Sequence, residues 1–147
     1  MAKTEIAFWD TSAVLPLCCR QTSSPEARRA NRRFRSSVVW WGTRVEIHSG
    51  VARLRRLTEL NDRGVLGAIR KWDVFEREAA VIRPVEHVLD VAATLPGRFG
   101  LRSQDAFQLA AALVWCREKP RNRAFICADH RLGEAASDAG FSVISLQ

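Results

Sequence analysis

The sequence lacks the patterns that mark membrane proteins, secreted proteins and small zinc domains. No apolar run approaches the roughly 20 residues that a helix needs to cross a bilayer. The start of the chain has neither the long apolar core nor the small-residue cleavage site of a signal peptide. The four cysteines include no Cys-x-x-Cys pair, and the adjacent Cys18 and Cys19 do not have the spacing of zinc ligands. We therefore expect a cytoplasmic protein without membrane association, whose cysteines are reduced and mostly buried.

Acidic residues are scarce in one part of the chain. Residues 20–71 contain 13 Lys or Arg against four Asp or Glu, a local balance of +9, whereas the whole chain carries +7. The rest of the chain is therefore slightly acidic. Such an asymmetry favours a polyanionic partner, with nucleic acid as the first choice. The structural alternative is that these arginines only form the solvated faces of amphipathic helices.

The length and the hydrophobic pattern indicate a single α/β domain over residues 1–147. Short apolar stretches bounded by turn or cap residues read as strands, and amphipathic segments between them read as helices. Strands that alternate with helices are typical of βαβ units and a parallel sheet. The five expected strands cover residues 6–9, 38–41, 80–83, 124–128 and 141–146.

Local patterns also predict where several helices begin and end. Thr43 and Glu46 match a capping box, in which the threonine caps the helix and the glutamate reaches back to it. Ser103 is the expected N-cap of a helix that runs to residue 117 and is apolar nearly all round. A helix is expected over residues 84–94, followed by a loop over 95–100, which contains proline and glycine.

Four acidic residues stand where the expected strands end or where the following helices begin. Asp10 follows the first strand and Asp129 follows the fourth, while Glu46 and Asp105 lie in the first turns of helices. Right-handed crossovers place strand ends and the starts of the next helices at one edge of a parallel sheet. We therefore expect these carboxylates to converge. Taken singly, each also has a structural explanation as a cap or as a partner of a helix dipole.

Four carboxylates gathered at one point would repel one another and raise one another's pKa. A divalent cation would remove that cost, and with no His or Cys in the set Mg²⁺ or Mn²⁺ fits whereas Zn²⁺ does not. A metal of this kind lowers the pKa of bound water and stabilises charge on a phosphate. The expected chemistry is phosphodiester hydrolysis.

The sequence around these acids resembles the PIN-domain family, and most closely its VapC-type toxins from bacterial toxin–antitoxin pairs. The resemblance covers essentially the whole chain. It is carried by Asp10-Thr11-Ser12-Ala13, by Glu46 early in a helix, by residues 101–112 (LRSQDAFQLAAA) and by residues 125–132 (FICADHRL).

The resemblance implies a three-layer α/β/α fold with a central five-stranded parallel sheet. It also implies an endoribonuclease that depends on Mg²⁺ or Mn²⁺, acts on RNA, forms a homodimer and is inhibited by a cognate antitoxin. Metal binding falls on Asp10 and Asp105, and Glu46 and Asp129 complete the catalytic site. Ser12 matches the family's hydroxyl beside the first acid and is expected to contact substrate.

Two residues depart from the family pattern. Cys127 stands where many members have threonine, and Gln108 stands where many have histidine. Both lie outside the four acids, so they put substrate detail in doubt more than catalysis. Arg44 is a further candidate for contact with RNA phosphate or with the antitoxin, the alternative being a solvated arginine.

Three other functions are alternatives to that of a toxin. A PIN nuclease of RNA processing would act without an antitoxin, and a catalytically silent module on the same fold would bind nucleic acid or protein without cutting. A phospho-receiver domain also gathers acids over a parallel sheet. That class needs an acidic pair after the first strand and a lysine near the last strand, and the only lysines here are Lys3, Lys71 and Lys119.

Overall fold

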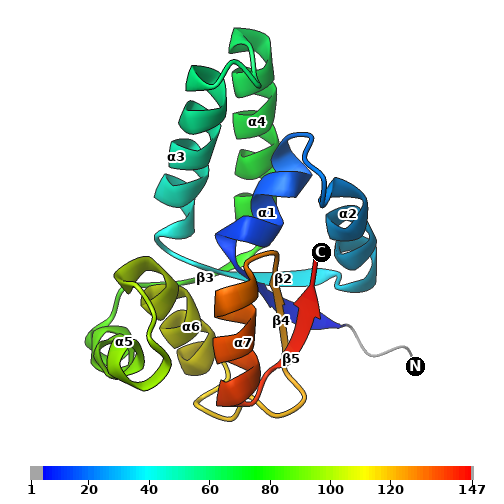
Figure 1. Ribbon diagram of the computed structural model, residues 1–147. Coiled ribbons are helices and arrows are strands. Elements are labelled where there is room, and N and C mark those ends of the chain that lie inside the picture. Colours follow the sequence, from blue (N-terminus) through cyan, green and yellow to red (C-terminus); the bar gives the residue numbers. More distant parts are fainter. Residues whose placement is uncertain (1–4, 147) are drawn as a thin grey trace.

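The computed structural model of the protein describes residues 5–146, and their five strands form one parallel sheet (Figure 1). The strand order is β3-β2-β1-β4-β5, with every neighbouring pair parallel. The single parallel sheet and the α/β class agree with the sequence prediction. The strands are β1 (Ile6–Trp9), β2 (Ser36–Trp40), β3 (Ala80–Ile82), β4 (Ala124–Cys127) and β5 (Ser142–Ser145).

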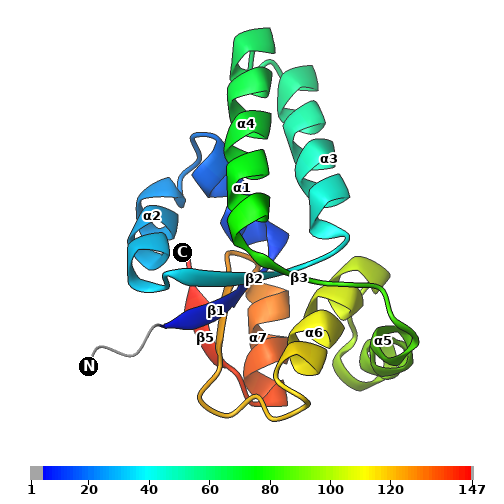
Figure 2. The same cartoon turned by 180° about the vertical axis from the view of Figure 1, so that it is seen from behind.

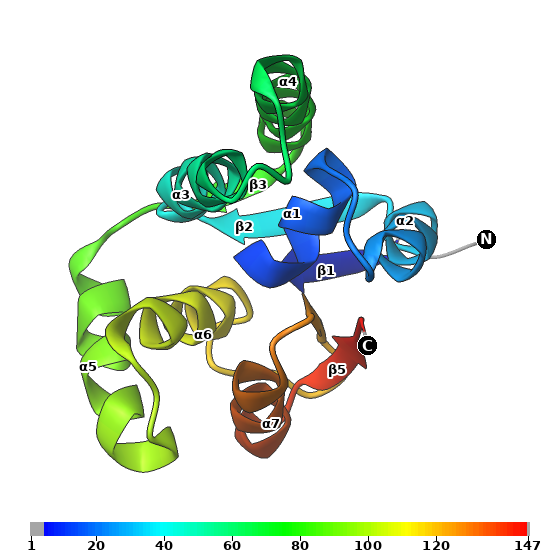
Figure 3. The same ribbon diagram turned by 45° about the horizontal axis from the view of Figure 1, so that its top comes forward.

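Seven helices within the described residues cover the two faces of this sheet. Figure 3 shows the first four helices on one side and the last three on the other, so the fold has three layers. The helices are α1 (Thr11–Cys18), α2 (Ser24–Arg33), α3 (Thr43–Arg56), α4 (Asp62–Glu78), α5 (Glu86–Phe99), α6 (Ser103–Trp115) and α7 (His130–Ala139).

The alternation of side chains along the central strand β1 explains why there are two cores. Successive side chains of a strand point to opposite faces of its sheet. Phe8 accordingly packs in the core beneath α5, α6 and α7, while Ala7 and Trp9 pack in the core beneath α1 to α4. All three are fully buried. A strand that is buried on both faces reads as a continuous apolar run, which is the pattern that revealed it in the sequence.

Helices α3 and α4 form a hairpin that extends beyond the sheet, as both Figure 1 and Figure 2 show.

No helix within residues 5–146 is long and apolar enough to cross a membrane. The four cysteines are free and buried, as expected from their spacing.

Helix α6 lies in the core on one side of the sheet, and alanine is the commonest residue on its buried face. Its buried face includes Ala106, Ala110, Ala111 and Ala112, which let the helix approach the sheet closely. Phe107 on the same helix stacks on Trp40 of β2, with 5.4 Å between the ring centroids. The position of α6 relative to the sheet is therefore fixed by close packing.

Two predicted N-caps are wrong. Helix α3 begins at Thr43 with Gly42 as its N-cap, and helix α6 begins at Ser103 with Arg102 as its N-cap. Neither cap makes a side-chain hydrogen bond to its helix. In α3 the reason is tertiary: the Thr43 hydroxyl and the Glu46 carboxylate both accept hydrogen bonds from another helix instead of closing a capping box.

The predicted loop over residues 95–100 is also wrong, because α5 continues to Phe99. Leu95 is only 1% exposed, so the extra turn is held by burial in the core. Gly100 then ends the helix with φ of 66°, a left-handed conformation that glycine adopts without strain, and its N–H donates to the carbonyl of Pro96.

Candidate active site

Asp10 lies at the carboxyl edge of the sheet, where the central strand β1 ends beside β4. Its backbone N–H donates to the carbonyl of Ile126 in β4 at 3.0 Å, which continues the pairing of β1 with β4. Its side chain caps α1 and is 5% exposed. Burial raises the pKa of this carboxyl from 3.8 to about 6; hydrogen bonds from Ser12 oppose the rise, and repulsion by Asp105 and Asp129 adds to it.

Ser12 fixes the orientation of Asp10. The backbone N–H and the hydroxyl of Ser12 both donate to Oδ2 of Asp10, and the same hydroxyl accepts a hydrogen bond from the N–H of Ala128 at 2.9 Å. This serine therefore ties the start of α1 to the end of β4. Its predicted contact with substrate stays a prediction, and the structure gives its hydroxyl a positioning role within the site.

Glu46 is held by a second set of hydrogen bonds, from two different helices. Thr11 Oγ1 donates to Oε1 of Glu46 at 3.2 Å, and Gln108 Nε2 donates to Oε2 at 3.1 Å. Burial and then repulsion by Asp10 raise the pKa of Glu46 from 4.5 to about 7, while the two hydrogen bonds lower it and Asp105 raises it further. The carboxyl is thus oriented but resists ionisation.

Gln108 links these elements and was not among the predicted site residues. Its Nε2 lies within hydrogen-bond distance of three oxygens, those of Thr11, Thr43 and Glu46, and its side chain is fully buried. Its Oε1 is buried without a partner among the described residues. The sequence signal for this role was an amide flanked on both sides by the apolar residues of α6, because a buried polar group needs hydrogen bonds.

Asp105 and Asp129 complete the acidic set. Asp105 is half-buried in the first turn of α6, and its pKa is raised by burial and by Asp129 and lowered by Arg102 and Arg131. Asp129 is exposed and caps α7, where its Oδ1 accepts the N–H of Leu132 at 2.9 Å. Both residues stand at the starts of helices, as the sequence predicted.

The four acids act on one another electrostatically. Asp10 is repelled by Asp105 and Asp129, Glu46 by Asp10 and Asp105, and Asp105 by Asp129. Residues separated by 24 or more positions are therefore brought into one negatively charged region. In the part of the chain that the structure describes, however, no three Asp, Glu, His or Cys side chains lie close enough to form a ready-made metal site.

The residues present are nevertheless suited to a hard divalent cation. The carboxylates offer only oxygen, the ligand that Mg²⁺ prefers, and Mg²⁺ is usually held by one or two carboxylates together with water and substrate oxygens. A dication would also favour the ionised forms of Asp10 and Glu46, whose pKa values are raised. The assignment of metal binding to Asp10, Glu46, Asp105 and Asp129 stays a prediction.

Cys127 lies near the acids, and Arg44 is a predicted contact for substrate. Burial, with repulsion by Asp10 and Asp129, raises the pKa of the Cys127 thiol to about 12, so this thiol is neutral and unsuited to act as a nucleophile. Arg44 is paired with Glu76 of α4, with a shortest distance of 2.9 Å between Nη2 and Oε1. This pair joins α3 to α4, and contact of Arg44 with substrate stays a prediction.

Solved structures with similar folds were found across nearly the whole chain. A toxin–antitoxin complex from Klebsiella pneumoniae matches with a TM-score of 0.65 and 15% identity, over 96% of this chain and 98% of that one. FitAcB from Neisseria gonorrhoeae matches with a TM-score of 0.65 and 16% identity, over 96% and 97%. VapBC2 from Rickettsia felis, bound to a promoter DNA fragment, matches with a TM-score of 0.64 and 9% identity, over 95% and 98%.

No protein-family model and no curated protein sequence matches the chain. The structural matches, at 9–16% identity, establish the fold. The chain shares the fold of these solved structures, and it has the five-stranded parallel sheet expected from the sequence.

Proposed function

We propose that the protein is a Mg²⁺- or Mn²⁺-dependent endoribonuclease and the toxic component of a VapBC-type toxin–antitoxin system. The observation that carries the proposal is that Asp10 and Glu46 lie close together at the carboxyl edge of the sheet, where Thr11 and Ser12 at the start of α1 donate hydrogen bonds to Glu46 and to Asp10. Repulsion among Asp10, Glu46 and Asp105, which raises their pKa values, agrees with this placement. Burying carboxylates that repel one another costs stability unless a bound cation offsets it. The similarity to toxin–antitoxin structures supports the toxin assignment.

The four carboxylates would hold the cation, which supplies an activated water and neutralises charge on the phosphate that is cut. Ser12 keeps Asp10 in one rotamer, and both hydrogen bonds that the Asp10 carboxylate accepts within residues 5–146 end on Oδ2, leaving Oδ1 for the ion. Thr11 and Gln108 hold Glu46 in the same way. These hydrogen bonds fix the orientation of Asp10 and Glu46 before a cation binds.

The test is a cleavage assay on single-stranded RNA with Mn²⁺ and with EDTA. Asp10→Asn and Asp105→Asn are expected to reduce cleavage to background and to leave the fold intact by circular dichroism. The matched control is Asp138→Asn, which removes an exposed carboxylate on α7 and is expected to cleave like the wild type. Full activity in either of the first two variants would refute the mechanism.

The toxin assignment is tested separately, in cells. Expression of the wild type is expected to arrest bacterial growth, and Asp10→Asn is expected to be harmless. Co-expression with the product of a short open reading frame directly upstream is expected to restore growth and to form a complex with the protein. RNA cleavage without growth arrest would favour an RNA-processing nuclease, and binding of RNA without cleavage would favour a silent module.

The proposed homodimer has its own measurement. Light scattering after size-exclusion chromatography is expected to give twice the mass of 16.5 kDa for the chain alone. A monomer at micromolar concentration would contradict that part of the proposal without affecting the nuclease assignment.

A further inference from the structure

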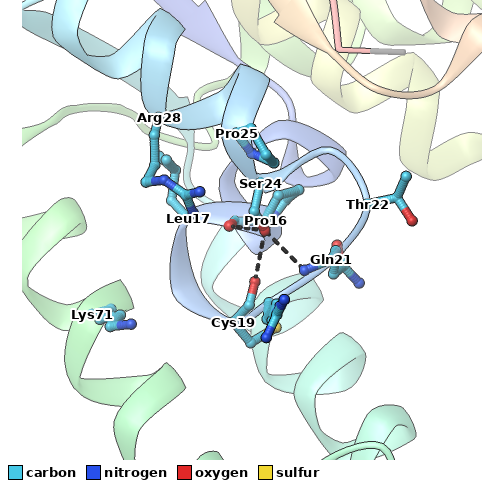
Figure 4. A pocket seen from close by; sticks show the side chains of 10 residues that line it. Pro16, Leu17, Cys19, Gln21, Thr22, Ser24, Pro25, Arg28 and Lys71 are labelled. Atoms are coloured by element: carbon cyan, nitrogen blue, oxygen red, sulfur yellow. Dashed lines mark hydrogen bonds between the residues drawn. The ribbon is translucent and has the colours of Figure 1, made fainter.

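A hollow lined by basic residues lies at the far end of α1 from the acids (Figure 4). It has a volume of about 750 Å³ and lies between the turn that joins α1 to α2 and the facing helix α4. Three cationic side chains line it: Arg20 from the turn, Arg28 from α2 and Lys71 from α4. No acidic residue is among its lining residues. We call this hollow the basic pocket.

The cations of the basic pocket are available to a ligand. All three residues are exposed, and none of them forms an ion pair within residues 5–146. Three other arginines of residues 20–71 are neutralised, since Arg33, Arg44 and Arg55 pair with Glu5, Glu76 and Asp62. The basic pocket gathers three of the unpaired cations around one hollow.

The wall of the basic pocket is ordered by a buried hydroxyl. Ser24 is 2% exposed, and its Oγ lies 2.8 Å from the carbonyl of Pro16 and 3.3 Å from that of Cys19. The same oxygen accepts the N–H of Gln21 at 2.8 Å. Figure 4 shows these bonds converging at the base of the turn. The turn is thus held in one conformation before any ligand arrives, which lowers the entropic cost of binding.

A second hollow adjoins the basic pocket. It has a volume of about 510 Å³ and shares Gln21 and Thr22 with the basic pocket. Its other lining residues include Ala128, which precedes Asp129 in the chain and donates its N–H to Ser12, and one acid, Glu26. The second hollow therefore extends from the turn between α1 and α2 to Ala128, the neighbour of Asp129 in the chain.

The separation between Asp10 and the basic pocket suits a short stretch of nucleic acid. Asp10 caps the first turn of α1, and the basic pocket begins at the last turn of the same helix, whose eight residues span about 12 Å. The acids repel a polyanion, so a strand that reaches them needs cations nearby to hold it. Proteins that bind single strands use such basic grooves to follow the backbone.

We propose that the basic pocket binds backbone phosphate of the single-stranded RNA whose scissile bond lies at the acidic site. This inference rests on the proposed ribonuclease function and adds the place where the strand is anchored. RNA is favoured over an acidic peptide because the basic pocket begins about 12 Å along α1 from Asp10, so that one strand can reach both places. Recognition through phosphate is independent of base sequence. The pocket would therefore add affinity and fix the position of the strand relative to the acidic site, without selecting a base sequence.

The test measures RNA binding without cleavage. A fluorescein-labelled single-stranded RNA is titrated with the intact chain in EDTA, and the dissociation constant is followed by anisotropy at several salt concentrations. The test variant combines Arg28→Gln with Lys71→Gln. Loss of two phosphate contacts is expected to weaken binding equally for different sequences and to reduce the salt slope of log K by about 1.4.

The matched control removes the same charge from the same two helices. Arg29 and Arg70 are exposed chain neighbours of the two test residues, do not line the basic pocket and form no ion pair within the described part of the chain. The variant that combines Arg29→Gln with Arg70→Gln is expected to keep the wild-type salt slope. Melting temperatures establish that both variants fold.

The outcomes separate this inference from the proposed function. If the test variant binds RNA as tightly as the wild type, the proposal that the basic pocket binds RNA is refuted. An equal loss of RNA affinity in the test and control variants also refutes it. A loss of affinity for a poly-glutamate peptide without a loss for RNA also overturns it. Reduced RNA affinity in the test variant supports the pocket even if the wild type fails to cleave RNA, which would overturn only the nuclease proposal.

Discussion

Replacing Asp10 with asparagine is expected to make the protein more stable at neutral pH while abolishing its activity. The pKa of the Asp10 carboxyl is raised from 3.8 to about 6, chiefly by burial. For an acid, a raised pKa in the folded state means that folding opposes ionisation. The penalty is absent below the unfolded pKa, grows as the pH rises through the window from 3.8 to about 6, and is fully present above it.

The size of the effect follows from that difference in pKa. It corresponds to about 3 kcal/mol of folding free energy lost when the buried carboxyl is ionised. Asparagine has nearly the same shape and carries no charge, but it accepts the hydrogen bonds of Ser12 more weakly than a carboxylate does. We therefore expect a net gain of about 1–2 kcal/mol at pH 8, which for a chain of this length raises Tm by about 2–8 °C.

The assay is thermal or denaturant unfolding of the wild type and of Asp10→Asn in EDTA, at about pH 8 and about pH 4, where the penalty is fully present and nearly absent. The gain is expected at the higher pH and is expected to vanish at the lower. Asp138→Asn, at an exposed position, serves as the control and is expected to change Tm little at either pH. A less stable Asp10→Asn protein, or a gain independent of pH, would refute the electrostatic reasoning.

Further predictions concern the packing around the site and the backbone. Gly140→Ala is expected to destabilise the fold by about 1–3 kcal/mol, because φ is 115° and a Cβ would meet a proline ring at 2.9 Å; Gly67→Ala, in open space within α4, is expected to gain up to about 1 kcal/mol. Denaturant titrations of both variants measure the difference, and a stable Gly140→Ala protein would contradict it. Gln108→Leu removes a donor from Glu46, so RNA cleavage is expected to fall more than stability, as activity and melting curves on one preparation would show. Leu109→Ala, in contrast, is expected to cost about 2–5 kcal/mol of unfolding free energy, since its side chain is fully buried; a cost below 1 kcal/mol by urea titration would exclude tight packing there.

The sheet could be predicted because its strands are signalled locally. Residues 7–9 and 124–127 are buried on both faces, and each run is followed within two positions by an aspartate that caps the next helix. The placement of the acids at helix starts follows from the same pattern. Coupling between Asp10 and Asp105 then follows from parallel topology, which requires no knowledge of individual contacts.

The features that were missed depend on tertiary contacts. Leu95 extends α5 through burial although a proline follows it, and no local pattern reports that burial. Thr43 has the sequence of a cap but bonds to Gln108, which lies 65 positions away. The pairing of Arg44 with Glu76 depends on how α3 packs against α4. Prediction from local sequence patterns therefore failed where the side chains of the site or of the helix hairpin have partners far away in the sequence.

The alanine-rich face of α6 has a genetic consequence. Asp105 and Gln108 are carried by the same helix whose buried alanines set its distance from the sheet. A bulkier residue at Ala110 or Ala111 would displace that helix and both side chains with it. A selection for cells that survive expression of the protein should therefore recover substitutions of these buried alanines by larger residues. Such substitutions would inactivate the protein although they lie at a distance from the carboxylates.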